Sequence, residues 1–396
     1  MFPKLRFKEF DGDLTESKLV ELTSWASGGT PAKDVPEYWG DDIPLISGAS
    51  MHTNQLYESD VKITKLGLQK GSKLALKDSI LILVRGSMLF NKIPMGITLG
   101  DVAFNQDVKC IRPKQQLAPL FLFQWLHAKE NTIQNKVTAT GIGAGKLDTA
   151  DLQNLKLYKP SLEEQTKIAT FLSAVDEKIS QLTQKHQLLR EYKQGMMQKL
   201  FSQQVRFKAD DKSEFGEWEE KELKDIAEIN PKSKKLPESF IYIDLESVEK
   251  GQLLLQKNIE LQDAPSRAQR LLAKGDVLFQ MVRPYQQNNY YFNLSGEYVA
   301  STGYAQIRTK LDSKFIYYAL HEKTFLDEVM NRCTGTSYPA INSSDLSSIE
   351  ILIPCLEEQT KIANFLSAID QKIEVVAQQI QQAKTWKKGL LQQMFV

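Results

Sequence analysis

The stretch Pro160–Ser202, PSLEEQTKIATFLSAVDEKISQLTQKHQLLREYKQGMMQKLFS, decides the fold, because it returns as Pro354–Val396, PCLEEQTKIANFLSAIDQKIEVVAQQIQQAKTWKKGLLQQMFV. The copies are 194 residues apart without a gap, and 22 of 43 aligned positions are identical. A second echo, Leu5–Lys8 (LRFK) against Val205–Lys208 (VRFK), has an offset of 200. The chain is therefore a tandem duplication with constant ends, between which its two halves diverge almost completely.

Both constant segments carry a heptad pattern, in which apolar residues recur at spacings of four and three. Such a pattern over four to five heptads predicts a coiled coil. We expect the two helices to pack on each other, although each could instead pack only on its own domain. A capping signature near Ser173–Asp176 also suggests a break in the first helix. The predicted seam consists of Ile168, Leu172, Val175, Ile179, Leu182, Leu189, Met196 and Leu200 in the first copy, and Ile362, Leu366, Ile369, Ile373, Val376, Ile380, Leu390 and Met394 in the second.

The variable segments, 1–159 and 205–353, contain short apolar or alternating runs separated by Gly, Pro, Asn and Ser. These runs predict strands and turns, with one helical stretch late in each segment. The sequence therefore predicts an α+β fold in four parts: domains 1–159 and 205–353, and helices 160–204 and 354–396. The predicted strands include Ile43–Ile46, Ser79–Val84, Ile241–Leu245 and Asp276–Val282, and the helical stretches are Leu117–Lys136 and Ser313–Asn331, the latter interrupted at His321-Glu322.

Composition excludes several classes of protein. The 396 residues include 50 basic and 49 acidic side chains, so the surface as a whole is not basic. With 42% hydrophobic and 25% charged residues, the chain is not a charged disordered one. Three distant cysteines favour a reducing compartment, and the chain shows neither a signal sequence nor a run of 18 apolar residues. We therefore expect a cytoplasmic protein without a membrane segment.

Sequence motifs for catalysis fail on inspection. Thr140–Lys146 is glycine-rich, but Leu147 stands where a phosphate-binding loop needs Ser or Thr. Glu219–Lys221 resembles a nuclease carboxylate–lysine motif, but a stretch so rich in Glu and Lys contains such triplets by chance. The histidines, read as unrelated between the halves, have no ligands at metal spacing. We expect neither a catalytic residue nor a metal site in this chain.

The repeated Pro-x-Leu-Glu-Glu-Gln-x-x-Ile-Ala-x-Phe-Leu-Ser-Ala-x-Asp motif and the tandem arrangement resemble the specificity (S) subunit, HsdS, of type I restriction–modification systems. Ala26–Pro31 (ASGGTP) with Ile43–Ile46 resembles the opening of that family's first target-recognition domain. Gly275–Phe279, Val282–Tyr285 and Ser301–Tyr304 resemble parts of its second. The resemblance covers essentially the whole chain.

This resemblance implies a non-catalytic subunit with two target-recognition domains, separated by two long helices that form an antiparallel coiled coil with pseudo-twofold symmetry. Each domain would read one half of a bipartite double-stranded DNA target. The implied partners are two modification subunits, which bind S-adenosylmethionine, and restriction subunits, which use ATP and magnesium; this chain would hold no cofactor. A coiled-coil scaffold without DNA specificity is the alternative, but it gives no reason for constant helices beside divergent domains.

The resemblance names no residue for individual bases, so we chose polar, basic and aromatic side chains expected on turns. Arg can bind guanine with two hydrogen bonds, and Asn or Gln can bind adenine in the same way. Residues 205–353 carry 19 basic and 23 acidic residues, so attraction to DNA there must be local. The candidates are Ser27, Thr30, Arg85, Asn91, Lys92, Gln106 and Thr140 in the first domain, and Arg267, Arg270, Arg283, Tyr285, Asn288, Asn289, Tyr304, Thr336 and Tyr338 in the second.

Overall fold

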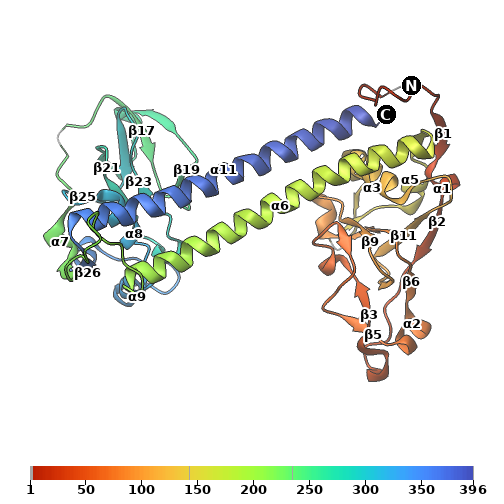
Figure 1. Ribbon diagram of the computed structural model, residues 1–396, viewed down its shortest axis with the longest axis horizontal. Helices are drawn as coiled ribbons and strands as arrows, with labels where there is room; N and C mark the ends of the chain where they lie inside the picture. Colours follow the sequence, from red (N-terminus) through yellow and green to blue (C-terminus); the bar gives the residue numbers. More distant parts are fainter. Residues whose placement is uncertain (1–2, 142, 234, 396) are drawn as a thin grey trace. The chain divides into compact units, whose positions relative to one another are not determined.

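The computed structural model describes residues 3–141, 143–233 and 235–395, which fall into two compact units. Unit 1 comprises residues 1–183 and 378–396, and unit 2 comprises residues 184–377. Helices α6 (Leu162–Phe201) and α11 (Leu356–Met394) each contribute one half to each unit (Figure 1). Each unit is therefore a globule of strands and short helices, together with one half of each long helix.

The globule of unit 1 contains two principal sheets. The first runs in the order β5 (Lys62–Ile63), β3 (Trp39–Ile46), β10 (Val102–Phe104), β6 (Lys73–Ala75), with β10 parallel to β3. The second runs β2 (Thr23–Ser27), β11 (Val108–Pro113), β7 (Ile80–Leu83), β9 (Met95–Thr98), β4 (Gln55–Leu56). A small sheet, β12 (Thr138–Ala139), β13 (Gly145–Lys146), β8 (Arg85–Gly86), and the pair β1 (Thr15–Lys18) with β14 (Lys156–Lys159) complete it.

Short helices join and cover these sheets. They are α1 (Leu19–Leu22), α2 (Lys65–Gly71), α3 (Pro119–Ala128), α4 (Glu130–Gln134) and α5 (Thr149–Gln153), with 3-10 turns η1 (Pro36–Tyr38), η2 (Gly48–Ser50) and η3 (Ser87–Phe90). The predicted helix Leu117–Lys136 is thus confirmed as two helices. Helix α3 is buried on most sides, since it packs between the sheets and the long helices.

The globule of unit 2 repeats this plan. One sheet runs β20 (Lys257–Glu260), β17 (Ser239–Ile243), β24 (Tyr298–Ser301), β21 (Ala268–Leu271), with β24 parallel to β17. The other runs β16 (Ala227–Ile229), β25 (Tyr304–Thr309), β22 (Val277–Gln280), β23 (Tyr290–Tyr291). The pairs β15 (Glu219–Glu222) with β26 (Glu350–Ile353) and β18 (Val248–Glu249) with β19 (Gln252–Leu253) complete the strands.

Helices of unit 2 follow the same order as those of unit 1. They are α7 (Leu223–Ile226), α8 (Ser313–Ala319), α9 (Lys323–Arg332) and α10 (Ser343–Ser347), with 3-10 turns η4 (Leu261–Asp263) and η5 (Pro284–Gln286). The predicted interruption at His321-Glu322 is confirmed, because the Glu322 side chain caps the start of α9. The α+β class and the predicted strands, found in β3, β7, β17 and β22, are confirmed as well.

The shared plan extends the duplication into the globules. Helices α3 and α8 occupy equivalent places, and the offset of 194 aligns Phe121 with Phe315 and His127 with His321. Our reading of the histidines as unrelated was therefore wrong for this pair. The similarity escaped the sequence comparison because few residues are shared outside the buried face of the helix.

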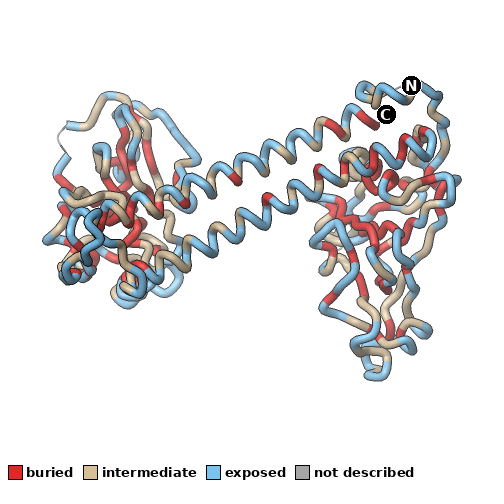
Figure 2. Tube along the Cα trace, viewed as in Figure 1, coloured by how far each residue is buried: buried red, intermediate tan, exposed pale blue. Residues whose placement is uncertain are grey.

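The predicted seam lies on the inner faces of the long helices. Ile168, Leu172 and Val175 join the core of unit 1, together with Leu390 and Met394 from the other end of α11. Buried stretches, in red, alternate with exposed ones along both long helices (Figure 2). In unit 2, Leu200 of α6 shares a core with Ile362, Leu366 and Ile369 of α11. The helices thus pack both on each other and on their globules. The remaining seam residues are buried (Leu182 and Val376) or half-buried (Ile179, Leu189, Met196, Ile373 and Ile380).

The suggested break near Ser173–Asp176 was wrong, because α6 is a single helix through this stretch. Val175 is buried in the core, and the Asp176 carboxylate binds Lys387 and Gln124 instead of capping a helix. A capping sequence does not end a helix where tertiary contacts already use its side chain.

Matching ion pairs tie the beginning of each half to its long helix. Arg6 donates two hydrogen bonds, both of 2.7 Å, to the buried Glu164 carboxylate, and Arg206 donates two to Glu358, at 3.1 and 2.7 Å. The neighbouring rings pair as well, with centroid distances of 5.7 Å for Phe7–Phe171 and for Phe207–Phe365. The LRFK echo is therefore the structural partner of the repeated Glu-Glu-Gln motif.

Candidate nucleic-acid interface

In unit 1, several strands of the two sheets end at one common edge. The amide of Gly29 donates to Phe104 O at 3.0 Å, and the amide of Asn105 donates to Ile46 O at 3.0 Å. The Val84 amide donates to Asp107 O at 2.8 Å. These backbone bonds place the loop after β2, the turn between β10 and β11, and the start of β8 next to one another. Thr30, Gln106 and Arg85, far apart in sequence, consequently meet at this edge.

The turn can pack this tightly only because residue 28 is glycine. A Cβ atom at Gly28 would lie 2.1 Å from Phe104 O and 2.4 Å from Asn105 O. No side chain tolerates such contacts with backbone oxygens. The first glycine of the ASGGTP motif, Gly28, is therefore required for the approach of the loop, which carries Thr30, to the β10–β11 turn.

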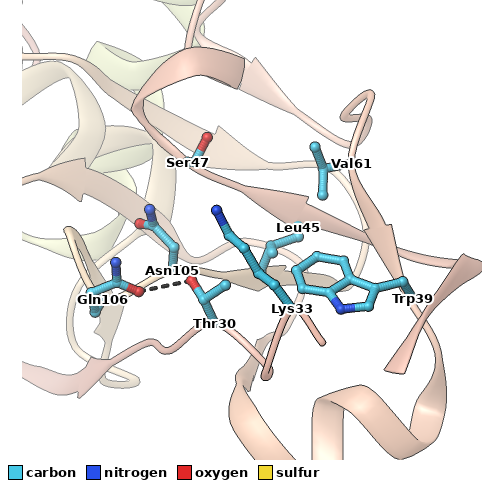
Figure 3. A pocket seen from close by; sticks show the side chains of 8 residues that line it. All are labelled: Thr30, Lys33, Trp39, Leu45, Ser47, Val61, Asn105 and Gln106. Atoms are coloured by element: carbon cyan, nitrogen blue, oxygen red, sulfur yellow. Dashed lines mark hydrogen bonds between the residues drawn. The ribbon is translucent and has the colours of Figure 1, made fainter. Parts of the chain in front are cut away.

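A cavity of about 610 Å³ opens at the same edge (Figure 3). Thr30 Oγ1 donates to Gln106 Oε1 at 2.8 Å, which orients the Gln106 amide across the opening. The Lys33 side chain extends toward the cavity beside the Trp39 ring. An amide and an ammonium group so placed can bind a base edge and a phosphate, respectively. The other lining residues are Leu45, Ser47, Val61 and Asn105.

Arg85 and the remaining candidates of the first domain lie at or beside the same edge, outside the cavity. Arg85 of β8 pairs with Lys146 of β13, so that two exposed basic residues are neighbours. Thr140 closes the adjacent hairpin, where its hydroxyl donates to Ala144 O at 2.9 Å. Asn91 and Lys92 are exposed after η3. Ser27 lies opposite Lys109 on the neighbouring strand, and its hydroxyl oxygen accepts a hydrogen bond from the Lys109 ammonium.

In unit 2, the equivalent hairpin, Thr334–Ala340, carries Tyr338, and Arg283, just before η5, stacks on this tyrosine. The backbone of Arg283 is tied to this hairpin by a 2.7 Å hydrogen bond from its amide to Pro339 O. The guanidinium carbon lies 4.3 Å from the centre of the Tyr338 ring, which is 63% exposed. Arg283 also has a left-handed backbone, with φ of 54°. Such a backbone costs a non-glycine residue free energy, which the surrounding contacts must offset. Thr336 and Tyr285 are exposed nearby on the hairpin and on η5.

Two further arginines stand at the same end of unit 2. The amide of Thr302 donates to Arg267 O at 2.9 Å, and the amide of Met281 donates to Gly303 O at 3.0 Å. The β24–β25 turn is thereby placed between Arg267 and the strand that leads to Arg283. Arg267 is exposed, whereas burial lowers the pKa of Arg270, whose Nε atom has no hydrogen-bond partner among the described residues.

The structure overturns two candidates and changes the role of a third. Tyr304 is fully buried in β25, and Asn289 is buried and accepts a 2.8 Å hydrogen bond from the Gln280 amide. Neither side chain can reach a base from these places, so both predictions were wrong. Asn288 is half-buried and accepts from the Lys250 amide at 3.0 Å, which fixes a hairpin. The sequence pattern had placed Tyr304 on a turn, but the strand begins at that residue.

Sequence reasoning missed four residues that line the edge in unit 1, namely Lys33, Trp39, Asn105 and Lys146. Lys33 follows the ASGGTP motif directly, and Asn105 precedes the chosen Gln106, so proximity to the motifs was an available signal. Lys146 ends the glycine-rich Thr140–Lys146 stretch, which also holds the candidate Thr140, whereas Trp39 gave no such signal. Only the pairing of distant strands brings them to the site.

Within the described ranges, no group of three or more His, Cys, Asp and Glu side chains could hold a metal ion. The same residues include no helix that is long and apolar enough to cross a membrane. The pKa of the half-buried His321 is lowered to about 4, mainly because the surrounding protein desolvates the ring, with Lys193 adding to the effect. Its Nδ1 atom lies 2.7 Å from Tyr317 O, within the core of unit 2.

Comparison with known proteins identifies the family of the chain. The family described as "Type I restriction modification DNA specificity domain" matches residues 12–190 and again residues 216–385. The chain belongs to the specificity subunits of type I restriction–modification systems. Its two globules are the two target-recognition domains, and DNA sequence specificity is the role of the family. This result favours DNA recognition over the alternative of a scaffold without it.

Relatives and solved structures agree with this assignment along the whole chain. The MjaVIII specificity subunit of Methanocaldococcus jannaschii is 26% identical, with 97% of this chain and 94% of the relative covered. The putative MjaX specificity subunit of the same organism is 28% identical, with 98% and 94% covered. The crystal structure of the S subunit from M. genitalium has a TM-score of 0.63 at 17% identity and covers 100% of this chain and 99% of its own, which shows that the fold is shared.

Proposed function

We propose that the two loop edges are the DNA-reading surfaces of this specificity subunit, one for each half of a bipartite double-stranded target. The observation that carries this is that equivalent loops of both units meet at the same strand ends but present different side chains. Arg85, Gln106 and Thr30 mark the edge in unit 1, and Arg283 with Tyr338 marks it in unit 2. Two half-sites of different sequence require domains that share a framework of sheets but present different side chains to the bases.

The chain would act as the non-catalytic part of a larger enzyme in the cytoplasm. Its partners would be two modification subunits, in which S-adenosylmethionine and the methylated adenine meet, and restriction subunits that use ATP and magnesium. Supporting this, a solved structure with a TM-score of 0.56 and 17% identity comes from work on complex assembly of the type I restriction–modification system. With its weak overall charge, the chain alone should bind DNA weakly and in a salt-sensitive way.

The test is to map methylated sites in a host that expresses the chain with its modification subunit, before and after single substitutions. Arg85→Ala should relax only the first half of the target, and Arg283→Ala only the second. Loss of a two-bond contact to guanine lowers discrimination by roughly 1–3 kcal/mol. Arg112→Ala is the matched control, since this exposed arginine lies on β11 away from the edge. Unchanged methylation patterns in both Arg variants would contradict the proposed surfaces.

A further inference from the structure

A pair of equivalent ion clusters joins the long helices, one cluster in each unit. In unit 1, Lys387 of α11 donates to Asp176 of α6 at 2.6 Å, and Gln124 of α3 donates to the same carboxylate at 2.8 Å. In unit 2, Lys193 of α6 and Asp370 of α11 are 2.6 Å apart, and the Tyr318 hydroxyl of α8 donates to Asp370 at 2.7 Å. Each cluster therefore binds α6, α11 and one helix of the globule.

The clusters are copies produced by the duplication. Asp176 and Asp370, Lys193 and Lys387, and Gln124 and Tyr318 are each separated by 194 residues. The roles of the helices are exchanged, because the aspartate belongs to α6 in unit 1 and to α11 in unit 2. The lysines occupy positions of the heptad seam, where a charged residue is costly unless it is paired. Lys387 is accordingly only 12% exposed, and Lys193 only 23%.

These positions discriminate between the directions in which the two helices could pair. In each helix the lysine follows the aspartate by 17 residues, so antiparallel helices bring each aspartate to a lysine. Parallel helices in register would bring equivalent residues together, Asp176 to Asp370 and Lys193 to Lys387. Like charges at such short distances repel. A slip of one heptad would separate both pairs at once and leave four half-buried charges unpaired.

We propose that these two clusters, which we call the Asp–Lys clasps, determine the direction and register of α6–α11 pairing and are positioning residues for the reading of both half-sites. Each clasp also binds its recognition domain through Gln124 or Tyr318, and so couples the helix pair to the domain. The inference rests on the proposed function only where it concerns DNA. The clasp itself is a property of the helices, and hydrogen exchange can test it without DNA.

The chain offers a sharp test at the clasp of unit 1. Asp176→Lys and Lys387→Asp each place like charges together, whereas the double variant restores an opposite pair with its sign reversed. Gln124 can serve the reversed pair, because its Oε1 atom is buried without a hydrogen-bond partner among the described residues and can accept from a lysine. Glu177→Lys and Lys388→Asp are the matched controls, since they make the same charge changes at exposed neighbouring positions.

Hydrogen exchange of α11 in the full complex with the modification subunits is the first measurement. The last turns of α11 pack into unit 1 through Leu390, Met394 and Phe395, so they report whether this helix stays docked. We expect each single reversal to speed exchange there by roughly tenfold or more, and the double variant to recover most of that loss. Control variants should exchange like the wild type. If the single variants exchange as slowly as the controls, or the double variant exchanges as fast as the single variants, the proposed role of the clasp is wrong.

Binding to DNA separates positioning from general stability. The probes are duplexes that carry the target mapped by methylation, with both half-sites intact or with one scrambled. Two domains held in place gain from binding both halves together, because the second contact is intramolecular. We expect the single reversals to reduce the preference for the intact target by roughly tenfold while half-site affinity stays unchanged, and the double variant to restore it. An equal loss on both duplexes would assign the clasp to stability alone and refute the positioning role.

The two proposals fail in different ways. If the wild-type complex shows no preference for a bipartite duplex, the proposed function is wrong, while the exchange data still decide whether the clasps hold the helices. If the wild type shows that preference and the single reversals keep it, the function stands and the positioning role is wrong.

Discussion

The principal sheets of the two recognition domains share their strand order apart from β4 in unit 1, yet the domains hold their proposed reading edges together by different chemistry. In unit 1, Gly28 lets the loop approach the β10–β11 turn directly. In unit 2, the corresponding loop has Asn230 in a left-handed backbone with φ of 54°, where its side chain accepts from the Gln306 amide at 3.0 Å and donates to Ser343 at 2.8 Å. The edge of unit 1 therefore depends on the absence of a side chain at Gly28, whereas the edge of unit 2 depends on the hydrogen bonds of the Asn230 side chain.

The charged groups differ in the same way. The edge of unit 1 presents Arg85 beside Lys146 and a lysine near the cavity, whereas that of unit 2 presents Arg283 stacked on Tyr338 within a net-acidic domain. The constant elements, by contrast, repeat almost atom for atom in the pairs Arg6–Glu164 and Arg206–Glu358. Duplication thus preserved the contacts that attach a domain to the helices, whereas the side chains at the proposed DNA-reading edges diverged.

The largest effect is expected at the buried carboxylates. Glu358 accepts from Arg206 and also from Trp218 Nε1 at 3.1 Å, whereas the side-chain partner of Glu164 is Arg6. Glu358→Ala should lower the free energy of unfolding of unit 2 by about 3–5 kcal/mol, because an arginine loses its buried partner. Glu164→Ala should lower the free energy of unfolding of unit 1 by less than Glu358→Ala lowers that of unit 2. Denaturant-dependent hydrogen exchange resolves the two units.

Glu163→Ala is the control for this pair, since Glu163 is exposed on the same turn of α6. Equal losses in the two buried variants would show that the Trp218 bond adds nothing. Losses no larger than that of the control would mean that the repeated motif does not attach the domains.

Acid should destabilise unit 2 through His321. The pKa of this half-buried ring is about 4 when folded, against 6.5 for a free histidine, so the unfolded chain binds the proton more readily. Its contribution is complete above pH 6.5 and is lost as the pH falls toward 4, by about 3 kcal/mol at pH 4. Hydrogen exchange between pH 7 and 4 should show unit 2 opening progressively, and His321→Gln should flatten this dependence.

Tyr317→Phe is the matched control, because Tyr317 binds His321 through its carbonyl and not through its hydroxyl. It should keep the acid dependence of the wild type. An NMR titration that gave His321 a pKa near 6.5 would refute this prediction directly.

A smaller and local effect is expected from Gly28→Ala. The added methyl group would overlap the Phe104 carbonyl, so the loop must move, at a cost of about 1–3 kcal/mol. Affinity for the first half-site should fall while that for the second is retained. Gly100→Ala is the control, since a Cβ there meets nothing within 4 Å. If half-site affinity did not change, the approach of this loop would not be needed for reading.

Much of the architecture was predictable because it depends on local patterns. The heptads at Ile168–Leu200 predicted a long helix, since a 3.5-residue repeat describes one face of it. The break before α9 followed from the His321-Glu322 interruption. The candidate residues were predicted less well. Tyr304 and Asn289 lie where turns and strands meet, and a shift of one residue there decides between exposure and burial.

The sequence by itself determined the duplication, the long helices, the class of the domains and the family, because repeats and heptads are properties of neighbouring residues. Only the tertiary structure decided which residues share an edge and which ions share a clasp. Thr30 meets Gln106, and Asp176 meets Lys387, through strand pairing and helix packing across long stretches of chain. Such long-range contacts depend on the free energy of the whole fold, so no local sequence pattern predicts them.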